Sequence, residues 1–375
     1  MRALRFTLFL LPIFVVFAAK IAFAGTLVPV MIMDNGFRAE DNRIDSRFGA
    51  YYDEKLMRSI LVPKAYADQT SVTLSAVPDY EDLITSNWKS AAIGHASKEL
   101  IGHARLVAQA LNERIGVFRS SEYPLIVVVD PRRQTTIEAV YNQGRAFSAY
   151  VAFTKKYFRS LDFIIKKQRV RIVVRSAFGI KVDAEFCKKM SFPPDCAAQF
   201  DSVFSDEFYR LIEENPQTAF VVAAGNNGKK ILISDRPEED ALELPNVLVV
   251  GATDESGENL ASDSDWHPRL VRIAASGVIM DASQNNRVER GTSFATPRVA
   301  DALREFMFMH PEISSAAKAI DLFLEKRGQR MYRLKSKIAS GRVLRTQSVT
   351  TEQPCGSSLL GDIIEGALNW WFIWY

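Results

Sequence analysis

Short apolar runs alternate with longer segments of helical spacing along most of the chain. Apolar runs, several of them rich in β-branched residues, predict buried strands at 27–33, 124–129, 170–174, 219–224, 246–250 and 270–274. Helical spacing of apolar residues predicts helices at 88–112, 135–158, 198–214 and 293–309. Strands that alternate with helices indicate an α/β fold with a mostly parallel central sheet. Residues 37–87 are polar and irregular, and we expect an insertion with few regular elements there.

The first 24 residues have the order of a secretory signal peptide. Arg2 and Arg5 precede an apolar run, and Ala22 and Ala24 supply the small residues before a cleavage site. We therefore expect an exported chain, periplasmic or extracellular after cleavage behind Ala24. The alternative is an uncleaved membrane anchor, although the run is short for a span of about 20 residues.

The net charge of +3 comes from the same segment, because it contains three basic residues and no acidic residue. The rest of the chain carries equal numbers of acidic and basic residues. A neutral body argues against a nucleic-acid-binding protein, which needs a basic surface. Hydrophobic residues make up 47% of the chain, which argues against a disordered protein.

The chain has three cysteines, and the sequence indicates one possible pair among them. Cys187 and Cys196 flank a short, turn-rich stretch, so they could form a disulfide bond in an oxidising compartment or stay as two thiols. Cys355 has no obvious partner.

The chain ends in Trp370, Trp371, Phe372, Ile373, Trp374 and Tyr375. This aromatic tail could pack on its own domain, occupy a cleft, or contact a membrane surface or a protein partner.

The segment 291–300 has the sequence GTSFATPRVA, which places Ser293 at the start of a predicted helix. Free backbone N–H groups and the helix dipole favour negative charge there, so one turn can offer both a nucleophile and an oxyanion donor. An ordinary helix N-cap is the alternative. The segment matches every fixed position of the serine motif of the subtilisin-like serine proteases, G-T-S-x-A-T-P-x-V-A.

Two further segments resemble that family, whose triad has the chain order Asp, His, Ser. VMIMDNGF resembles the strand that ends in the catalytic acid, which implies Asp34 in that role. FVVAAGNNG is similar to the segment of the oxyanion-hole asparagine, which implies Asn226. An Asp or Asn that merely begins a turn is the alternative at both positions.

The histidine motif is the degraded one. The family has H-G-T-H-V-A-G, whereas this chain has His103 followed by Ala104, Arg105 and Leu106. The residues after His103 fit the family helix, so the resemblance favours His103 as the base. His95 is the rival, and a site that lacks its base is the third possibility.

The resemblance implies a three-layer α/β/α subtilase fold over residues 25–348, with a tail at 349–375. It implies a serine endopeptidase that acts on polypeptides through Asp34, His103, Ser293 and Asn226, without a metal or an organic cofactor. Structural calcium occurs in the family, but the sequence shows no ligand pattern to assign it. The alternatives are a peptide-binding pseudoprotease, a maturation or transpeptidation enzyme for one dedicated substrate, and an envelope interaction protein.

Overall fold

The computed structural model describes residues 28–34, 48–53, 58–63, 103, 106–107, 109–111, 125–129, 147–167, 169–176, 184–189, 191–193, 195–231, 241–281, 287–339 and 341–344. A ten-stranded sheet runs through this part of the chain in the order β11-β12-β8-β7-β6-β5-β1-β4-β3-β2. The strands are β1 (Val30–Asp34), β2 (Phe48–Asp53), β3 (Arg58–Pro63), β4 (Leu125–Val129), β5 (Ile172–Arg175), β6 (Ala219–Ala223), β7 (Val247–Thr253), β8 (Val271–Ser276), β11 (Gly328–Arg330) and β12 (Arg342–Leu344). The seven strands from β12 to β4 are parallel to their neighbours, and antiparallel strands flank them at both edges.

The central strands are mostly apolar because both faces of the sheet are covered. Side chains alternate between two hydrophobic cores, as the period of a strand requires. In β1, Met31 and Met33 belong to one core, whereas Val30 and Ile32 belong to the other. The same alternation continues through β5, β6, β7 and β8.

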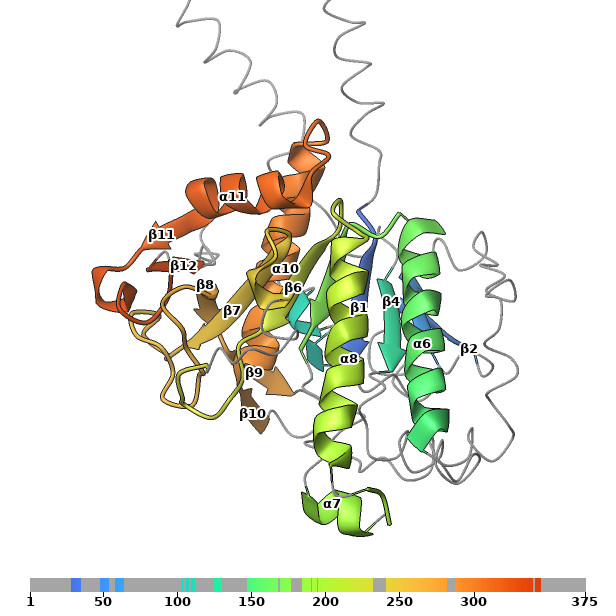
Figure 1. Ribbon diagram of the computed structural model, residues 1–375. Helices are drawn as coiled ribbons and strands as arrows, with labels where there is room; N and C mark the ends of the chain where they lie inside the picture. Colours follow the sequence, from blue (N-terminus) through green and yellow to red (C-terminus); the bar gives the residue numbers. More distant parts are fainter. Residues whose placement is uncertain are drawn as a thin grey trace, which may run out of the picture.

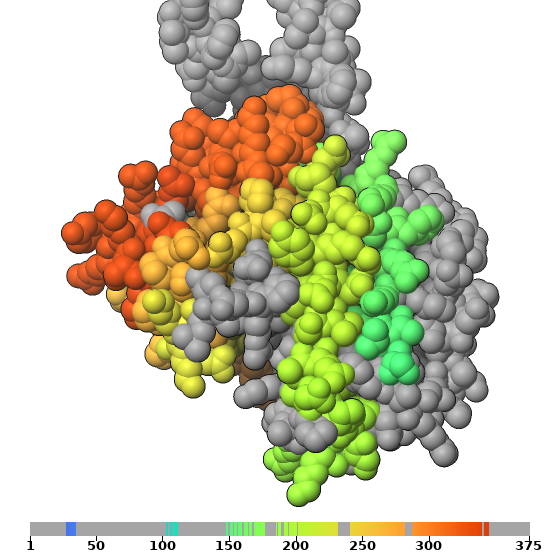
Figure 2. All heavy atoms as spheres, in the orientation of Figure 1, coloured from blue at the N-terminus to red at the C-terminus, as the bar shows by residue number. Residues whose placement is uncertain are grey.

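Helices α6 (Phe147–Lys167) and α8 (Cys196–Glu213) cover one face of the sheet side by side (Figures 1 and 2). Aromatic rings join the two helices to each other and to the sheet. Phe204 of α8 packs edge-on against Phe158 of α6, and Phe208 of α8 packs edge-on against Phe220 of β6. The Arg175 guanidinium lies 4.8 Å and 4.7 Å from the ring centres of Phe204 and Phe208, so two cation–π contacts hold this charge inside the core.

Helices α10 (Thr292–Met309) and α11 (Ala316–Arg327) cover the opposite face (Figure 1). Most of α10 is buried, since it lies between the sheet and α11. Helices on both faces of a mostly parallel sheet confirm the predicted three-layer α/β/α fold.

Smaller elements complete the described part of the chain. A separate hairpin, β9 (Val278–Asp281) with β10 (Arg287–Arg290), leads directly into α10. A short 3₁₀ helix, η6 (Tyr332–Leu334), follows β11. Helix α7 (Ala184–Lys189) is joined to the start of α8 by a disulfide bond between Cys187 and Cys196, the first of the two alternatives that the sequence left open.

The structure differs from the sequence-based prediction in three respects. The hairpin β2–β3 lies within 37–87, where few regular elements were expected. Helix α6 continues beyond residue 158 to Lys167, because Leu161 and Ile165 extend the buried stripe at helical spacing. The hairpin β9–β10 and the helix α11 were not predicted at all. In the described ranges, no helix combines the length and the hydropathy that a bilayer span requires.

Candidate active site

Asp34 ends β1 at the carboxyl edge of the sheet, and its side chain is fully buried. Strand β1 lies between β4 and β5, where the order of strands reverses, and open α/β sheets place their sites at this point. His103 Nδ1 lies 3.0 Å from Asp34 Oδ1 and 2.9 Å from Asp34 Oδ2. A carboxylate that accepts from Nδ1 leaves Nε2 as the acceptor, which is the tautomer that a general base needs.

Opposing influences set the pKa of His103. Burial lowers this pKa, but the Asp34 charge and the hydrogen bond to Asp34 raise it, with a smaller contribution from the charge of Glu289. The net result is a pKa above the ordinary value for histidine. The pair is therefore arranged to stabilise a positive charge on the imidazole when it takes up a proton.

Ser293 lies in the first turn of α10 and is only 7% exposed. Its hydroxyl donates a hydrogen bond of 2.8 Å to the backbone carbonyl of Ser176, at the end of β5. Next to it, the Phe294 ring centre lies 5.6 Å from that of His103, so the serine turn and the imidazole are neighbours. Among the described residues, no hydrogen bond joins the Ser293 hydroxyl to His103.

Asn226 lies in the loop after β6, and hydrogen bonds hold the oxygen of its side-chain amide. Its Oδ1 accepts from the backbone N–H of Thr292 at 2.8 Å and from the Thr292 hydroxyl at 2.9 Å. This fixes the orientation of the amide and leaves Nδ2 without an acceptor among the described residues. Gly291 has φ of +145°, and a Cβ there would lie 3.1 Å from Asn226 Nδ2. An amide N–H beside a nucleophilic turn is a suitable donor to an oxyanion.

Asp265 holds the loop that carries Asn226. Its carboxylate accepts from the backbone N–H groups of Asn227 and Lys229 and from the Asn227 side chain, each at 2.9 Å. Its own N–H donates to the Gly225 carbonyl at 2.9 Å. Neither Asp265 nor Thr292 was predicted from the sequence as a site residue. Thr292 could have been found as part of the serine motif, whereas nothing in the sequence around Asp265 distinguishes it.

The other histidines have different environments. His267 is buried, and its Nδ1 accepts from the backbone N–H groups of Arg269 and Leu270. Burial, followed by the charges of Lys230 and Arg269, lowers its pKa. His310 Nδ1 lies 3.2 Å from a carboxylate oxygen of Glu312 at the end of α10.

Several predictions lie outside the described residues: His95, Cys355, the signal segment 1–24 and the aromatic tail. Within the part of the chain that is described, no group of three or more His, Cys, Asp or Glu side chains could hold a metal ion.

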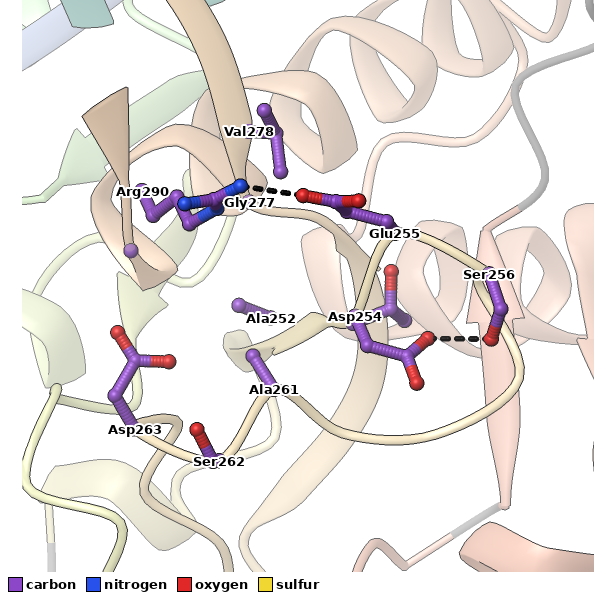
Figure 3. A pocket seen from close by; sticks show the side chains of 12 residues that line it. Ala252, Asp254, Glu255, Ser256, Ala261, Ser262, Asp263, Gly277, Val278 and Arg290 are labelled. Atoms are coloured by element: carbon purple, nitrogen blue, oxygen red, sulfur yellow. Dashed lines mark hydrogen bonds and ion pairs between the residues drawn. The ribbon is translucent and has the colours of Figure 1, made fainter. Parts of the chain in front are cut away.

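A cavity of about 360 Å³ adjoins the serine turn (Figure 3). It lies at the carboxyl ends of β7 and β8, and Gly291 and Arg290 form part of its wall. Three acidic side chains line it, Asp254, Glu255 and Asp263. The carboxylate of Glu255 is ion-paired with Arg290.

Comparison with known proteins gives one family and a set of similar folds. Residues 144–324 match the model of the subtilase family, and this range contains Ser176, Asn226 and Ser293 but neither Asp34 nor His103. No curated protein sequence is significantly similar to the chain.

Among solved structures, the A-subunit of the AB5 toxin from E. coli is 16% identical with a TM-score of 0.48, covering 86% of this chain and 90% of that one. The epidermin leader peptide processing serine protease of Staphylococcus aureus is 16% identical with a TM-score of 0.49, covering 84% and 74%. The protease domain of PatA is 17% identical with a TM-score of 0.46, covering 86% and 94%.

The serine motif and the asparagine motif lie within the matched range and meet in space through the contacts of Thr292 with Asn226. The family supports a serine protease, a hydrolase, in general terms. Residues 144–324, which lie on this three-layer α/β/α fold, are therefore similar to the subtilase family.

Proposed function

We propose that the chain is an exported serine endopeptidase. Ser293 Oγ attacks the carbonyl carbon of a peptide bond, and His103 Nε2 takes up the hydroxyl proton. Asn226 Nδ2 and the Ser293 N–H donate to the oxyanion. His103 then protonates the leaving amine, and water hydrolyses the acyl-enzyme by the same route in reverse.

The contact between Asp34 and His103 carries this proposal. A fully buried carboxylate with both oxygens within 3.0 Å of Nδ1 has two roles in acyl transfer: it orients the imidazole and stabilises its protonated form. The contact joins residues 69 positions apart in sequence, so it results from the fold and not from local structure. The immobilised amide of Asn226 supports the same reaction, because a preorganised donor needs no reorientation as charge develops.

One observation favours a second candidate, a pseudoprotease that binds peptides without cleaving them. The hydroxyl of Ser293 points to the Ser176 carbonyl instead of to the imidazole. In the enzyme, rotation about the Cα–Cβ bond of Ser293 brings the hydroxyl to His103. In an enzyme, the Ser293 side chain has to cross only the small barrier between two rotamers when a substrate is bound. In a pseudoprotease, the hydroxyl stays hydrogen-bonded to the Ser176 carbonyl.

Fluorophosphonate labelling of the purified chain separates the two candidates, because the reagent bonds covalently only to an activated serine. We expect the wild type to be labelled and Ser293→Ala to remain unlabelled. A folded wild-type chain that takes up no label would exclude the endopeptidase and leave the pseudoprotease.

Single variants then assign the individual roles. His103→Ala should abolish labelling, whereas His95→Ala should retain it; the reverse pattern would make His95 the base. Asn226→Ala should lower the rate of peptide hydrolysis by about 10²–10³, the range known for subtilisin itself. Thr292→Val removes one of the two hydrogen bonds that hold the amide and should cost about two- to tenfold.

The remaining parts of the proposal concern location and partners. We propose that residues 1–24 direct export and are removed, that the substrate is a polypeptide, and that the chemistry uses no cofactor. Mass measurement of the exported chain tests the cleavage behind Ala24. For the aromatic tail, truncation after Cys355 is the test: unchanged activity and location would leave only packing on the protein's own surface.

A further inference from the structure

The cavity beside the serine turn belongs to a definite side of the reaction centre. Gly291 lines it, and Ser293 is two residues further along the chain, so the Cα atoms of these two residues lie within roughly 7 Å of each other. Its other walls come from the loops that follow β7 and β8 and from the junction with β9 at Gly277 and Val278. The volume of about 360 Å³ lies at the small end of the range for ligand sites, about 300–1,000 Å³.

The order of strands tells which part of a substrate reaches it. The Ser176 carbonyl follows β5, whereas the cavity lies at β7 and β8, and Asn226 on β6 lies between them. The sequence SAFG at 176–179 resembles the family's S-x-G segment, an edge that pairs with an extended substrate. In this proposal, the acyl half of the peptide pairs with that edge. The leaving half therefore extends from Ser293 toward the carboxyl ends of β7 and β8.

The cavity is lined by more acidic side chains than basic ones. Asp254, Glu255 and Asp263 contribute three carboxylates, and Arg290 contributes the single cation among the lining residues. Arg290 is engaged by Glu255, whereas Asp263 is exposed and has no ion-pair partner within the described ranges. Figure 3 shows Asp263 on the opposite side of the cavity from Asp254 and Glu255.

Asp254 remains ionised. Hydrogen bonds from the Ser256 hydroxyl at 2.6 Å and from the Asn259 amide at 2.9 Å lower its pKa below the ordinary value. The remainder of the wall is small and apolar, from Ala252, Ala261 and Val278. Such a wall accommodates the methylene stem of a long cationic side chain whose head reaches a carboxylate.

We propose that this cavity binds the side chain of one of the first two residues after the scissile bond and selects lysine or arginine there. The proposal rests on the proposed endopeptidase function and names its substrate class: polypeptides with a basic residue on the leaving side. Asp263 is the specificity-determining residue, since its charge is not already neutralised by Arg290.

A peptide library tests the preference directly. The purified full-length chain is incubated with peptides made from a bacterial proteome by a glutamate-specific protease, which leaves lysine and arginine inside the peptides. Mass spectrometry then identifies the new termini. We expect lysine and arginine to be enriched at the first or second leaving-side position. Acetylating the lysines of the same library should remove the enrichment for lysine and preserve it for arginine.

Three variants make the test specific. Asp263→Asn should reduce the basic enrichment about two- to fivefold, the value of one partly exposed ion pair. Asp263→Lys should shift the preference toward acidic residues. Glu258→Gln is the matched control, because Glu258 belongs to the same loop but does not line the cavity, and it should behave as the wild type.

The outcomes separate the two levels of the proposal. Cleavage without basic enrichment, or with an enrichment that Asp263→Lys leaves unchanged, overturns the inference while the endopeptidase stands. A folded chain that cleaves no peptide and takes up no fluorophosphonate overturns the proposed function, and this inference with it.

Discussion

Replacing Asp34 by asparagine should both slow the reaction and move its pH dependence. The substitution keeps the shape of the side chain but removes a charge whose two oxygens lie 3.0 Å and 2.9 Å from His103 Nδ1. A hydrogen bond to a charged group contributes about 1.5–3 kcal/mol, which corresponds to about 10- to 150-fold in rate. If the amide instead donates to the imidazole and reverses its tautomer, the loss should approach about 10⁴-fold.

The sign of the pH effect follows from the causes of the His103 pKa. Burial lowers the pKa, and Asp34 supplies most of what raises it above the ordinary value, with a smaller part from Glu289. In Asp34→Asn the burial remains and the main opposing influence is lost, so the pKa should fall. His103 acts as a base only when neutral, so the acid limb of the rate profile should move to lower pH.

The same pKa shift links pH to stability in the wild type. A histidine whose pKa is raised by folding stabilises the folded state fully below the unfolded-state pKa. This contribution is lost as the pH rises through the raised folded-state value. Thermal melts across that range should therefore show a pH-dependent component in the wild type that Asp34→Asn lacks.

The assay is the second-order rate of fluorophosphonate labelling, measured from acid to neutral pH. Asp206→Asn is the matched control, since it makes the same substitution at an exposed position on α8. An Asp34→Asn chain that is labelled at the wild-type rate, with its acid limb unmoved, would refute the role of Asp34 as the partner of the base.

Three further predictions concern the parts that support the site. Asp265→Ala removes the acceptor of three hydrogen bonds and should lower the free energy of unfolding by about 1–3 kcal/mol, seen in urea melts, and also slow labelling; full activity would contradict it. Gly277→Ala places a Cβ 2.7 Å from the Gly291 carbonyl oxygen, so it should displace the serine turn. We expect kcat to fall, with a smaller effect on the free energy of unfolding. Replacing Cys187 and Cys196 by alanine should cost about 2–3 kcal/mol of stability with labelling retained, and a loss of labelling in the folded variant would argue against a purely structural bond.

The sequence predicted the layers of the fold and the elements that carry the chemistry. Residues 30–33 of β1 and all of β6 are apolar, as is typical of a parallel strand that is buried on both faces. Asp34 is the last residue of β1 and Asn226 lies three residues after β6, so the topology brings them to one edge. The family pattern then supplied the third element, α10 with Ser293.

Other features depend on tertiary contacts and could not be predicted. The hydrogen bonds of Asp265 join it to a loop some 36 to 38 residues earlier in the chain. The hairpin β9–β10 exposes Met280 and Val288, so it lacks the apolar alternation that reveals a strand. The hydroxyl direction of Ser293 is a rotamer, which sequence does not encode locally.

The wide sequence separation of the site contacts has a consequence for when the protein becomes active. Asp34 and His103 are 69 positions apart, Asn226 and Thr292 are 66 apart, and Ser176 and Ser293 are 117 apart. Contacts of this range form late in folding, after the loops between them have closed. In a chain that is still being synthesised, Ser293 therefore lies apart from Asn226 and Ser176 until α10 has followed and packed. For the proposed endopeptidase, completion of the fold would thus be the step that assembles the catalytic site and makes the chain active.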